Sequence, residues 1–273
     1  MNDSTGPPVA TRRTSPRLTR ALVAGVVGVS LSIASIAMVS TAAAAPTWVS
    51  QIGGTAGAAQ HSASWAGYVV TARSPFTSVA AQWTVSAVSC VKSTSTQAAV
   101  QWVGFDGWYD KTVEQGGTEA YCSGTTPVYS AWWEMYPSNQ ITQVFSVRPG
   151  DVITASVIYT NRVFRIVVHD VATGKALTVA QPCKATVTCG RSSAEWIVEA
   201  PAYGGHGADL ARWNQASFTH TVASVSVNPA ATSSIAAFTN IRVTMTGAHG
   251  RRAQPGALSA GGQGFAEAWI ASK

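Results

Sequence analysis

Two glutamates lie close together on one predicted strand of a chain that is poor in acidic residues. The segment SSAEWIVEAPAYGG covers residues 192–205, and its centre is rich in strand-favouring residues. Because side chains alternate along a strand, Glu195, Ile197 and Glu199 point to one face and the residues between them point to the other. A carboxylate presented this way can act as a general base toward water. The alternative is the solvated face of an ordinary half-buried strand.

A second group of residues that could take part in binding or catalysis lies between positions 101 and 137. It consists of QWVGFDGWYD, then KTVEQGGTEAYC, then YSAWWEMYP. The segments are rich in aromatic side chains, which include Trp102, Trp108, Trp132, Trp133 and Tyr136. Such side chains can line an extended groove for a ligand, although tryptophan also fills the cores of β-sandwiches.

Standard catalytic signatures are absent from the sequence. There is no GxSxG, no HExxH, no P-loop and no dinucleotide fingerprint. The five histidines are scattered, and no Cys or His spacing is typical of zinc. We therefore predict neither a metal nor a cofactor.

The elements that must position these residues are predicted to be strands. From Ser64 onward, short aromatic and β-branched segments are bounded by Gly, Pro, Ser or Asp. Residues 151–160 and 162–170 are predicted to pair as a hairpin across Asn161, and a single helical turn is predicted near 207–213. Regularly spaced strands without intervening helices predict an all-β sandwich or barrel.

The first residues have the layout of an export signal. Four arginines precede an uncharged apolar run and a small-residue stretch, which predicts a signal peptide over 1–45. An uncleaved membrane anchor is the alternative. We predict a linker or short propeptide over 46–62 and one domain over 63–273. The net charge of +6 falls to about +3 without the leader, which argues against nucleic-acid binding and a stable membrane association.

The cysteines form an even set in a chain predicted to be secreted, which favours disulfides. Cys183 and Cys189 bracket a loop short enough for a hairpin bridge, which leaves Cys90 to pair with Cys122. Three pairings are formally open, and reduced thiols are the alternative.

Four motifs occur in an order that resembles a known family. WVGFDG, EQGG, YSAWWEMYP and SAEWIVEAP follow one another, and the closing AQPGALSAGGQGFAEAWI also fits. Over residues 64–271 the chain resembles the glutamic peptidases, the eqolisins, which are pepstatin-insensitive acid endopeptidases. The resemblance implies an antiparallel β-sandwich of two long sheets, similar to the concanavalin A lectins.

The resemblance also implies roles for individual residues. It makes Gln115 and Glu195 the catalytic pair, places Glu134 and Asp106 beside them, and makes Trp102, Trp133 and Tyr136 substrate-binding residues. Glu114 is expected to point away from its neighbour Gln115 into solvent. The segment after Gln115, Met135 and the Thr-His pair at 219–220 depart from the family pattern.

The chemistry of hydrolysis suits this pair. An ionised Glu195 can take a proton from water, and the Gln115 amide can donate to the developing oxyanion. With a glutamate pKa near its reference of about 4.3, activity would extend well into acid. The expected partners are polypeptide substrates of a monomeric enzyme. Two alternatives stay open, namely a glycoside hydrolase using Glu134 and Glu195 as paired carboxylates, and a non-catalytic carbohydrate- or protein-binding module.

Overall fold

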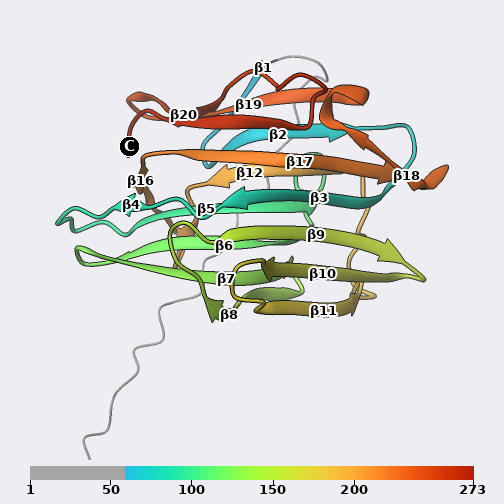
Figure 1. Ribbon diagram of the computed structural model, residues 1–273, viewed down its shortest axis with the longest axis horizontal. Coiled ribbons are helices and arrows are strands. Elements are labelled where there is room, and N and C mark those ends of the chain that lie inside the picture. The colour runs from blue at the N-terminus through green and yellow to red at the C-terminus, as the bar shows by residue number, and fades with distance from the viewer. Residues whose placement is uncertain (1–58) are drawn as a thin grey trace, which may run out of the picture. The chain divides into compact units, whose positions relative to one another are not determined.

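The computed structural model describes residues 59–273 and consists almost entirely of antiparallel strands (Figure 1). One run of paired strands, the site sheet, comprises in spatial order β1 (Ala59–Ser62), β19 (Thr239–Gly247), β2 (Trp65–Thr71), β12 (Ser193–Glu199), β5 (Gln97–Phe105), β6 (Val113–Ser123), β7 (Thr126–Tyr136) and β8 (Asn139–Ser146). Strand β1 belongs to the sheet, so the paired structure begins four residues before the predicted boundary at 63.

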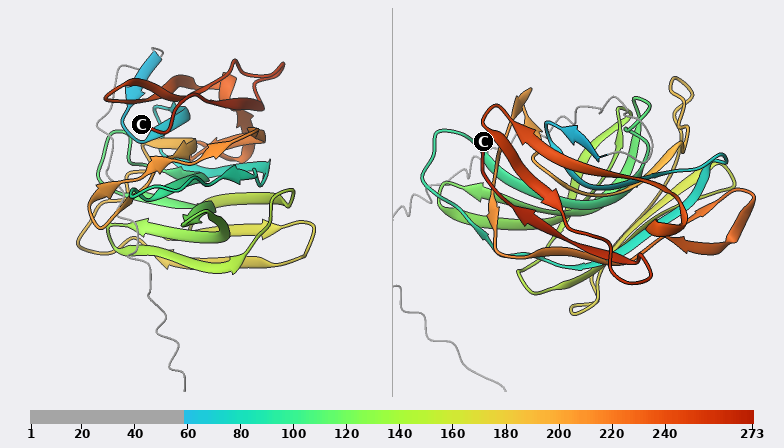
Figure 2. Two further views of the ribbon diagram at one scale, coloured as in Figure 1. Left: turned by 90° about the vertical axis from the view of Figure 1, so that its left-hand side faces the viewer. Right: turned by 90° about the horizontal axis from the view of Figure 1, so that it is seen from above.

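A second run of strands covers one face of the site sheet. It comprises β20 (Gly250–Pro255), β21 (Gly264–Trp269), β17 (Ala216–Val225), β3 (Phe76–Thr84), β9 (Val152–Thr160), β10 (Val163–Asp170) and β11 (Ala176–Pro182), with β18 (Asn228–Ser234) also paired to β17. Strand β20 pairs with β19, so the two runs are continuous at one edge. The strands curve along their length, and the two runs lie face to face (Figure 2). The predicted all-β sandwich is confirmed.

Short elements complete the described chain. They are β4 (Val88–Ser89), β13 (Ala202–Tyr203), β14 (His206–Gly207), β15 (Asp209–Leu210), β16 (Arg212–Trp213) and the 3-10 helix η1 (Ile235–Ala237). The predicted helical turn near 207–213 is wrong, because this segment is extended and pairs with β5 and β4. The predicted hairpin across Asn161 is confirmed, with Asn161 and Arg162 at positive φ in its turn.

The main hydrophobic core lies between the two sheets. Trp196, Phe105 and Phe164 are fully buried there. Two tryptophans also bond across the interface: Trp196 Nε1 donates to the Ala80 carbonyl at 2.9 Å, and Trp83 Nε1 donates to Thr118 Oγ1 at 3.0 Å. These bonds satisfy the polar edge of each indole inside an apolar core and fix how the site sheet sits on its partner.

Both predicted disulfides are present. Cys90 is bonded to Cys122, and Cys183 is bonded to Cys189. The first bond ties the loop after β4 to β6, and the second closes the loop that leads into β12. Both therefore restrain segments next to strands of the site sheet.

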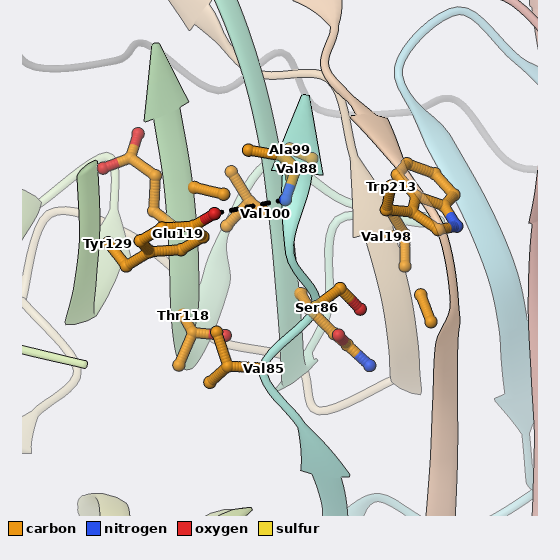
Figure 3. A pocket seen from close by; sticks show the side chains of 13 residues that line it. Val85, Ser86, Val88, Ala99, Val100, Thr118, Glu119, Tyr129, Val198 and Trp213 are labelled. Atoms are coloured by element: carbon orange, nitrogen blue, oxygen red, sulfur yellow. Dashed lines mark hydrogen bonds between the residues drawn. The ribbon is translucent and has the colours of Figure 1, made fainter. Parts of the chain in front are cut away.

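A small cavity of about 30 Å³ lies between the sheets, lined mainly by apolar side chains that include Val85, Val88 and Trp213 (Figure 3). The Tyr129 hydroxyl accepts a hydrogen bond from the Val88 amide at 3.1 Å at its edge. The cavity is large enough for about one or two water molecules. It lies on the core side of β5 and β6, away from the face that carries Glu195.

Within residues 59–273, no helix has the length and apolar character needed to cross a bilayer. The predicted signal peptide and most of the predicted linker lie outside the described residues.

Candidate active site

Four residues from neighbouring strands form one row across the site sheet. Glu195 of β12 pairs with Gly104 of β5, Gly104 pairs with Gln115 of β6, and Gln115 pairs with Glu134 of β7. Directly paired residues of antiparallel strands point to the same face. The side chains of Glu195, Gln115 and Glu134 therefore emerge on one face, here called the site face, which is opposite the main core.

A glycine separates the two predicted catalytic residues. Glu195 and Gln115 lie two strand spacings apart, which is about 10 Å between their Cα atoms. A Cβ atom at Gly104 would lie 2.9 Å from Gln115 Cβ and 3.1 Å from Trp102 Cζ3. Any side chain here would crowd Gln115 and the space between the two functional groups. The glycine therefore lets the Gln115 side chain and the Trp102 ring approach the backbone of β5 closely.

The Gln115 amide is held by the next strand. Its Nε2 donates to Glu134 Oε2 at 2.7 Å, and both side chains are buried. Gln115 Oε1 and Glu134 Oε1 accept no hydrogen bond from the described part of the chain. The amide is thus oriented by a carboxyl group, while one N–H and its oxygen stay available to a ligand.

Glu195 is fully buried, and neither carboxyl oxygen has a hydrogen-bond partner among residues 59–273. Burial raises its pKa well above the ordinary value, and the nearby Asp106, Asp110 and Glu114 carboxyls raise it further. The Ser193 hydroxyl lowers the pKa of Glu195. An unpaired buried carboxyl is costly to the fold, and such groups are typical of functional sites.

Asp106 links the end of β5 to the start of β12. It has a φ of 68°, and its carboxylate accepts the amides of Arg191 at 2.7 Å and Ser192 at 2.6 Å. The Ser192 hydroxyl lies 3.1 Å from Asp106 Oδ1 and 2.8 Å from Asp110 Oδ2, so the two carboxyl groups share its single proton. Burial, together with Asp110, raises the pKa of Asp106 to about 6. Asp106 therefore fixes the backbone that leads directly into Glu195.

Glu114 points away from Gln115, as expected, but it is not solvated. It pairs with Phe105 on the core side and is only 1% exposed. Burial raises its pKa well above the ordinary value, and Asp106 adds to the shift. The prediction of a solvated side chain is wrong because the second sheet covers the other face of β6.

Glu199 lies on the site face but is neither solvated nor at a free edge. It is 1% exposed, and its Oε2 accepts a hydrogen bond from Trp102 Nε1 at 2.9 Å. The other end of the same indole, Cζ3, lies beside Gly104. The Trp102 ring therefore reaches from Glu199 to the middle of the Glu195–Gln115 row.

The predicted aromatic residues divide between the two faces. Trp102 and Tyr136 lie on the site face, whereas Trp133 points to the main core side and does not join them. The sequence did not predict that Trp65 lies on the site face. Its ring contacts Trp102 edge-on at 5.0 Å, and it pairs with Glu199 across β2 and β12. Only the strand pairing reveals this neighbour, because Trp65 lies in a segment without polar signals.

Within the part of the chain that the structure describes, no group of three or more His, Cys, Asp or Glu residues is arranged to hold a metal ion.

Acid pH is expected to stabilise the fold. Burial raises the pKa well above the ordinary value for Glu114, Glu134, Glu195, Glu199 and Glu267. The folded state then binds more protons than the unfolded state between the two pKa values, so stability declines as pH rises. Their contribution is complete below the unfolded pKa and is lost as pH rises through the folded values. Urea unfolding should show a smaller free energy of unfolding at pH 7 than at pH 4.

Glu267→Gln supplies the matched control for this pH dependence. Glu267 lies on β21, away from the site row, and neither of its oxygens has a partner in the described chain. The variant should lose less free energy of unfolding over the same pH range, because one titrating group has been removed. A parent protein that gains stability between pH 4 and pH 7 would contradict the prediction.

The fold and the row together define a class: an all-β sandwich that presents a buried carboxyl and an amide in register on either side of a glycine. The model of the Peptidase A4 family matches residues 63–252, which is more than half of the chain. The chain therefore belongs to the Peptidase A4 family, the eqolisins, and it is a hydrolase of the glutamic-endopeptidase type.

Solved structures of this family share the fold. Scytalido-glutamic peptidase, crystallised with a transition state analog inhibitor, is 20% identical over 76% of this chain and 98% of its own, with a TM-score of 0.65. SCP-B, an eqolisin bound to the tripeptide Ala-Ile-His, is 19% identical over 76% and 98%, with a TM-score of 0.61. Aspergilloglutamic peptidase from Aspergillus niger is 21% identical over 64% and 99%, with a TM-score of 0.56. The search of curated protein sequences finds no match.

Proposed function

We propose that this chain is a secreted acid endopeptidase in which Glu195 activates water and Gln115 stabilises the oxyanion. The observation that carries the proposal is the row of Glu195, Gly104 and Gln115, in which both Glu195 carboxyl oxygens and Gln115 Oε1 have no hydrogen-bond partner among residues 59–273. Peptidases of this family act on polypeptides. The peptide carbonyl and the attacking water would meet between the functional groups of Glu195 and Gln115.

In the proposed reaction Glu195 takes a proton from water as the oxygen attacks the carbonyl carbon. The carbonyl oxygen becomes negative and accepts a hydrogen bond from Gln115, whose amide is already oriented by Glu134. Glu195 then returns the proton to the leaving nitrogen, and the C–N bond breaks. Each proton is accounted for without a metal or cofactor.

The raised pKa of Glu195 changes the expected pH profile. A general base must be ionised, so its acid limb lies above the ordinary glutamate pKa of about 4.3. We therefore expect the acid limb of the profile to lie at higher pH than the limb that an ordinary glutamate pKa would give.

Export is the second part of the proposal. Residues 1–45 would serve as the signal peptide and the residues up to 62 as a linker or short propeptide. Two disulfides and no free cysteine within residues 59–273 suit an oxidising compartment.

The test is cleavage of a denatured protein substrate by the purified chain between pH 3 and pH 7. Pepstatin and a chelator are present throughout. Cleavage that continues with both additives and is greatest below pH 7 supports the proposal. Cleavage blocked by pepstatin or by the chelator would contradict it, as would no cleavage at any pH.

A glycosidase with Glu134 and Glu195 as paired carboxylates fits the row less well. The two residues lie three strands apart, about 14 Å between Cα atoms. Gln115 stands between them and is bonded to Glu134.

Glu199 is expected to act through Trp102. Glu199→Leu removes the acceptor of the indole N–H, which should lower kcat/KM about tenfold, the equivalent of 1.4 kcal/mol for a hydrogen bond to a charged or buried group. Glu199→Gln retains an acceptor oxygen and should stay within about threefold of the parent, a difference under 1 kcal/mol. The tryptophan emission spectrum should shift only in the leucine variant. Equal losses in both variants would mean that the carboxyl itself is required.

A further inference from the structure

Two loops lead into the proposed catalytic pair, one toward each residue. Residues 106–112 connect β5 to β6, and Gln115 lies three residues beyond them. Residues 183–192 connect β11 to β12, and Glu195 lies three residues beyond them. The second loop is also closed on itself by a disulfide. Because each strand starts where its loop ends, the position of one loop relative to the other bears on the separation of Gln115 and Glu195.

One serine joins the two loops. Ser192 Oγ lies 2.8 Å from Asp110 Oδ2 and 3.1 Å from Asp106 Oδ1. The Gly107 amide donates to the other Asp110 oxygen, Oδ1, at 2.9 Å, and the Ser192 amide donates to Asp106 at 2.6 Å. The side chains of Asp106, Asp110 and Ser192, here called the loop clamp, therefore tie the loop before β6 to the loop before β12.

The loop clamp lacks one proton when both of its carboxyl groups are ionised. A serine hydroxyl has a single hydrogen, so Ser192 can donate to one carboxylate at a time. The second carboxylate then faces an oxygen lone pair and a like charge. If one carboxyl is protonated, its O–H donates to Ser192 Oγ while the Ser192 hydroxyl donates to the other carboxylate. Asp110 is half-buried, so this proton can come from solvent and return to it.

Carboxyl groups face the loop clamp from two neighbouring strands. Glu114 of β6 and Glu195 of β12 are buried, and Asp106 and Asp110 raise the pKa of both. Burial, followed by the Asp110 charge, raises the pKa of Asp106 to about 6. The shared proton is therefore held at mildly acidic pH and is lost toward neutral pH.

The cations of the two loops point elsewhere. The Arg191 guanidinium donates to the Phe76 carbonyl at 3.1 Å and lies 3.8 Å over the Tyr159 ring. Lys111 and Lys184 are exposed, and charges in solvent are largely screened. The acidic neighbours therefore dominate the electrostatics of the loop clamp.

We propose that Asp110 is a positioning residue: with Asp106 it shares one proton through Ser192 Oγ. This loop clamp holds Glu195 at its working separation from Gln115. The inference rests on the proposed peptidase function and adds a residue that acts on the catalytic pair without touching substrate. When the proton is lost, two carboxylates repel each other across one hydroxyl and the loops separate. Activity then falls toward neutral pH, although the base itself is ionised there.

The test compares Asp110→Asn and Asp110→Ala with the parent in steady-state cleavage of one peptide from pH 4 to pH 8. The asparagine amide donates to Ser192 Oγ without an added proton, so the ratio of its kcat to the parent kcat should rise at least about threefold between pH 5 and pH 7. The alanine variant has neither donor nor acceptor there and should lower kcat at least about fivefold at pH 5, with little change in KM.

Asp151→Asn is the matched control. The Asp151 carboxylate also accepts a loop amide, that of Arg148 at 2.7 Å, but it lies in the loop before β9, which does not lead into the catalytic pair. Its kcat should follow that of the parent at every pH.

A titration reads the shared proton without using activity. Carbon-13 carboxyl NMR of labelled aspartate should show Asp106 titrating near pH 6 in the parent. In Asp110→Asn this midpoint should fall by at least about half a pH unit, because the neighbouring charge and hydrogen bond that raise it are gone. Asp151→Asn should leave the midpoint in place.

The outcomes separate the positioning role from the proposed function. A kcat ratio that stays constant with pH, or equal losses in the asparagine and alanine variants, would overturn the inference while leaving the peptidase intact. A parent in which no aspartate titrates above pH 5 would do the same. A parent that cleaves no peptide at any pH would instead overturn the proposed function, and the positioning role would fall with it.

Discussion

Glu195→Gln is expected to lower kcat by about 10⁴-fold, the upper range for loss of a positioned general base. The substitution keeps the shape of the side chain but removes the group that accepts and returns the proton. Glu195 is fully buried, and both its oxygens are unpartnered in the described chain. The variant should therefore fold at least as stably as the parent at neutral pH, because it no longer buries an ionisable group there.

Glu199→Gln is the matched control for this result. It makes the same chemical change on the same face of the same strand, four residues further on. It should retain most activity, as the Trp102 bond persists. The measurement is single-turnover cleavage of a peptide, with urea unfolding of both variants. Comparable losses in both would show that the Glu195 carboxyl has no special role.

The second large effect is expected for Gln115→Ala. Removing the proposed oxyanion donor should lower kcat by about 10²–10³-fold, equivalent to about 2.7–4 kcal/mol. KM should change little, because the oxyanion exists only in the transition state. The pH limits should also stay in place, since an amide does not titrate in this range.

Gln101→Ala controls for the loss of a buried glutamine. Gln101 lies on β5 but points to the core side, where its amide donates to the Ser217 carbonyl at 2.9 Å. This variant should lose stability and keep kcat within about twofold, a difference below 0.5 kcal/mol. If Gln115→Ala raised KM with kcat unchanged, Gln115 would be a substrate-binding residue and the oxyanion role would be wrong.

Much of the fold could be predicted from local sequence. Period-two alternation and β-branched residues mark β9 and β10, and Asn161 marks their turn. The short spacing of Cys183 and Cys189 predicted their disulfide and, by exclusion, the other one. These features depend on neighbours along the chain, so a single sequence suffices to find them.

Local sequence does not identify residues 113–123 as a strand. It contains two glycines, two glutamates and little alternation, yet it forms β6, a long strand inside the site sheet. Both faces of β6 are covered, so the usual contrast between a buried and a wet face is missing. The same coverage buries Glu114, which sequence alone placed in solvent.

By itself, then, the sequence determined the strands, their alternation and, through family motifs, the residue types available for chemistry. The tertiary structure determined which of these residues lie close together. Register places Glu195, Gly104 and Gln115 in one row, although 80 positions separate Gln115 from Glu195 in the chain. It also turns Trp133 to the core and brings Trp65 to the site face. The physical reason is that alternation is a local property, whereas pairing and coverage depend on contacts between strands distant in sequence.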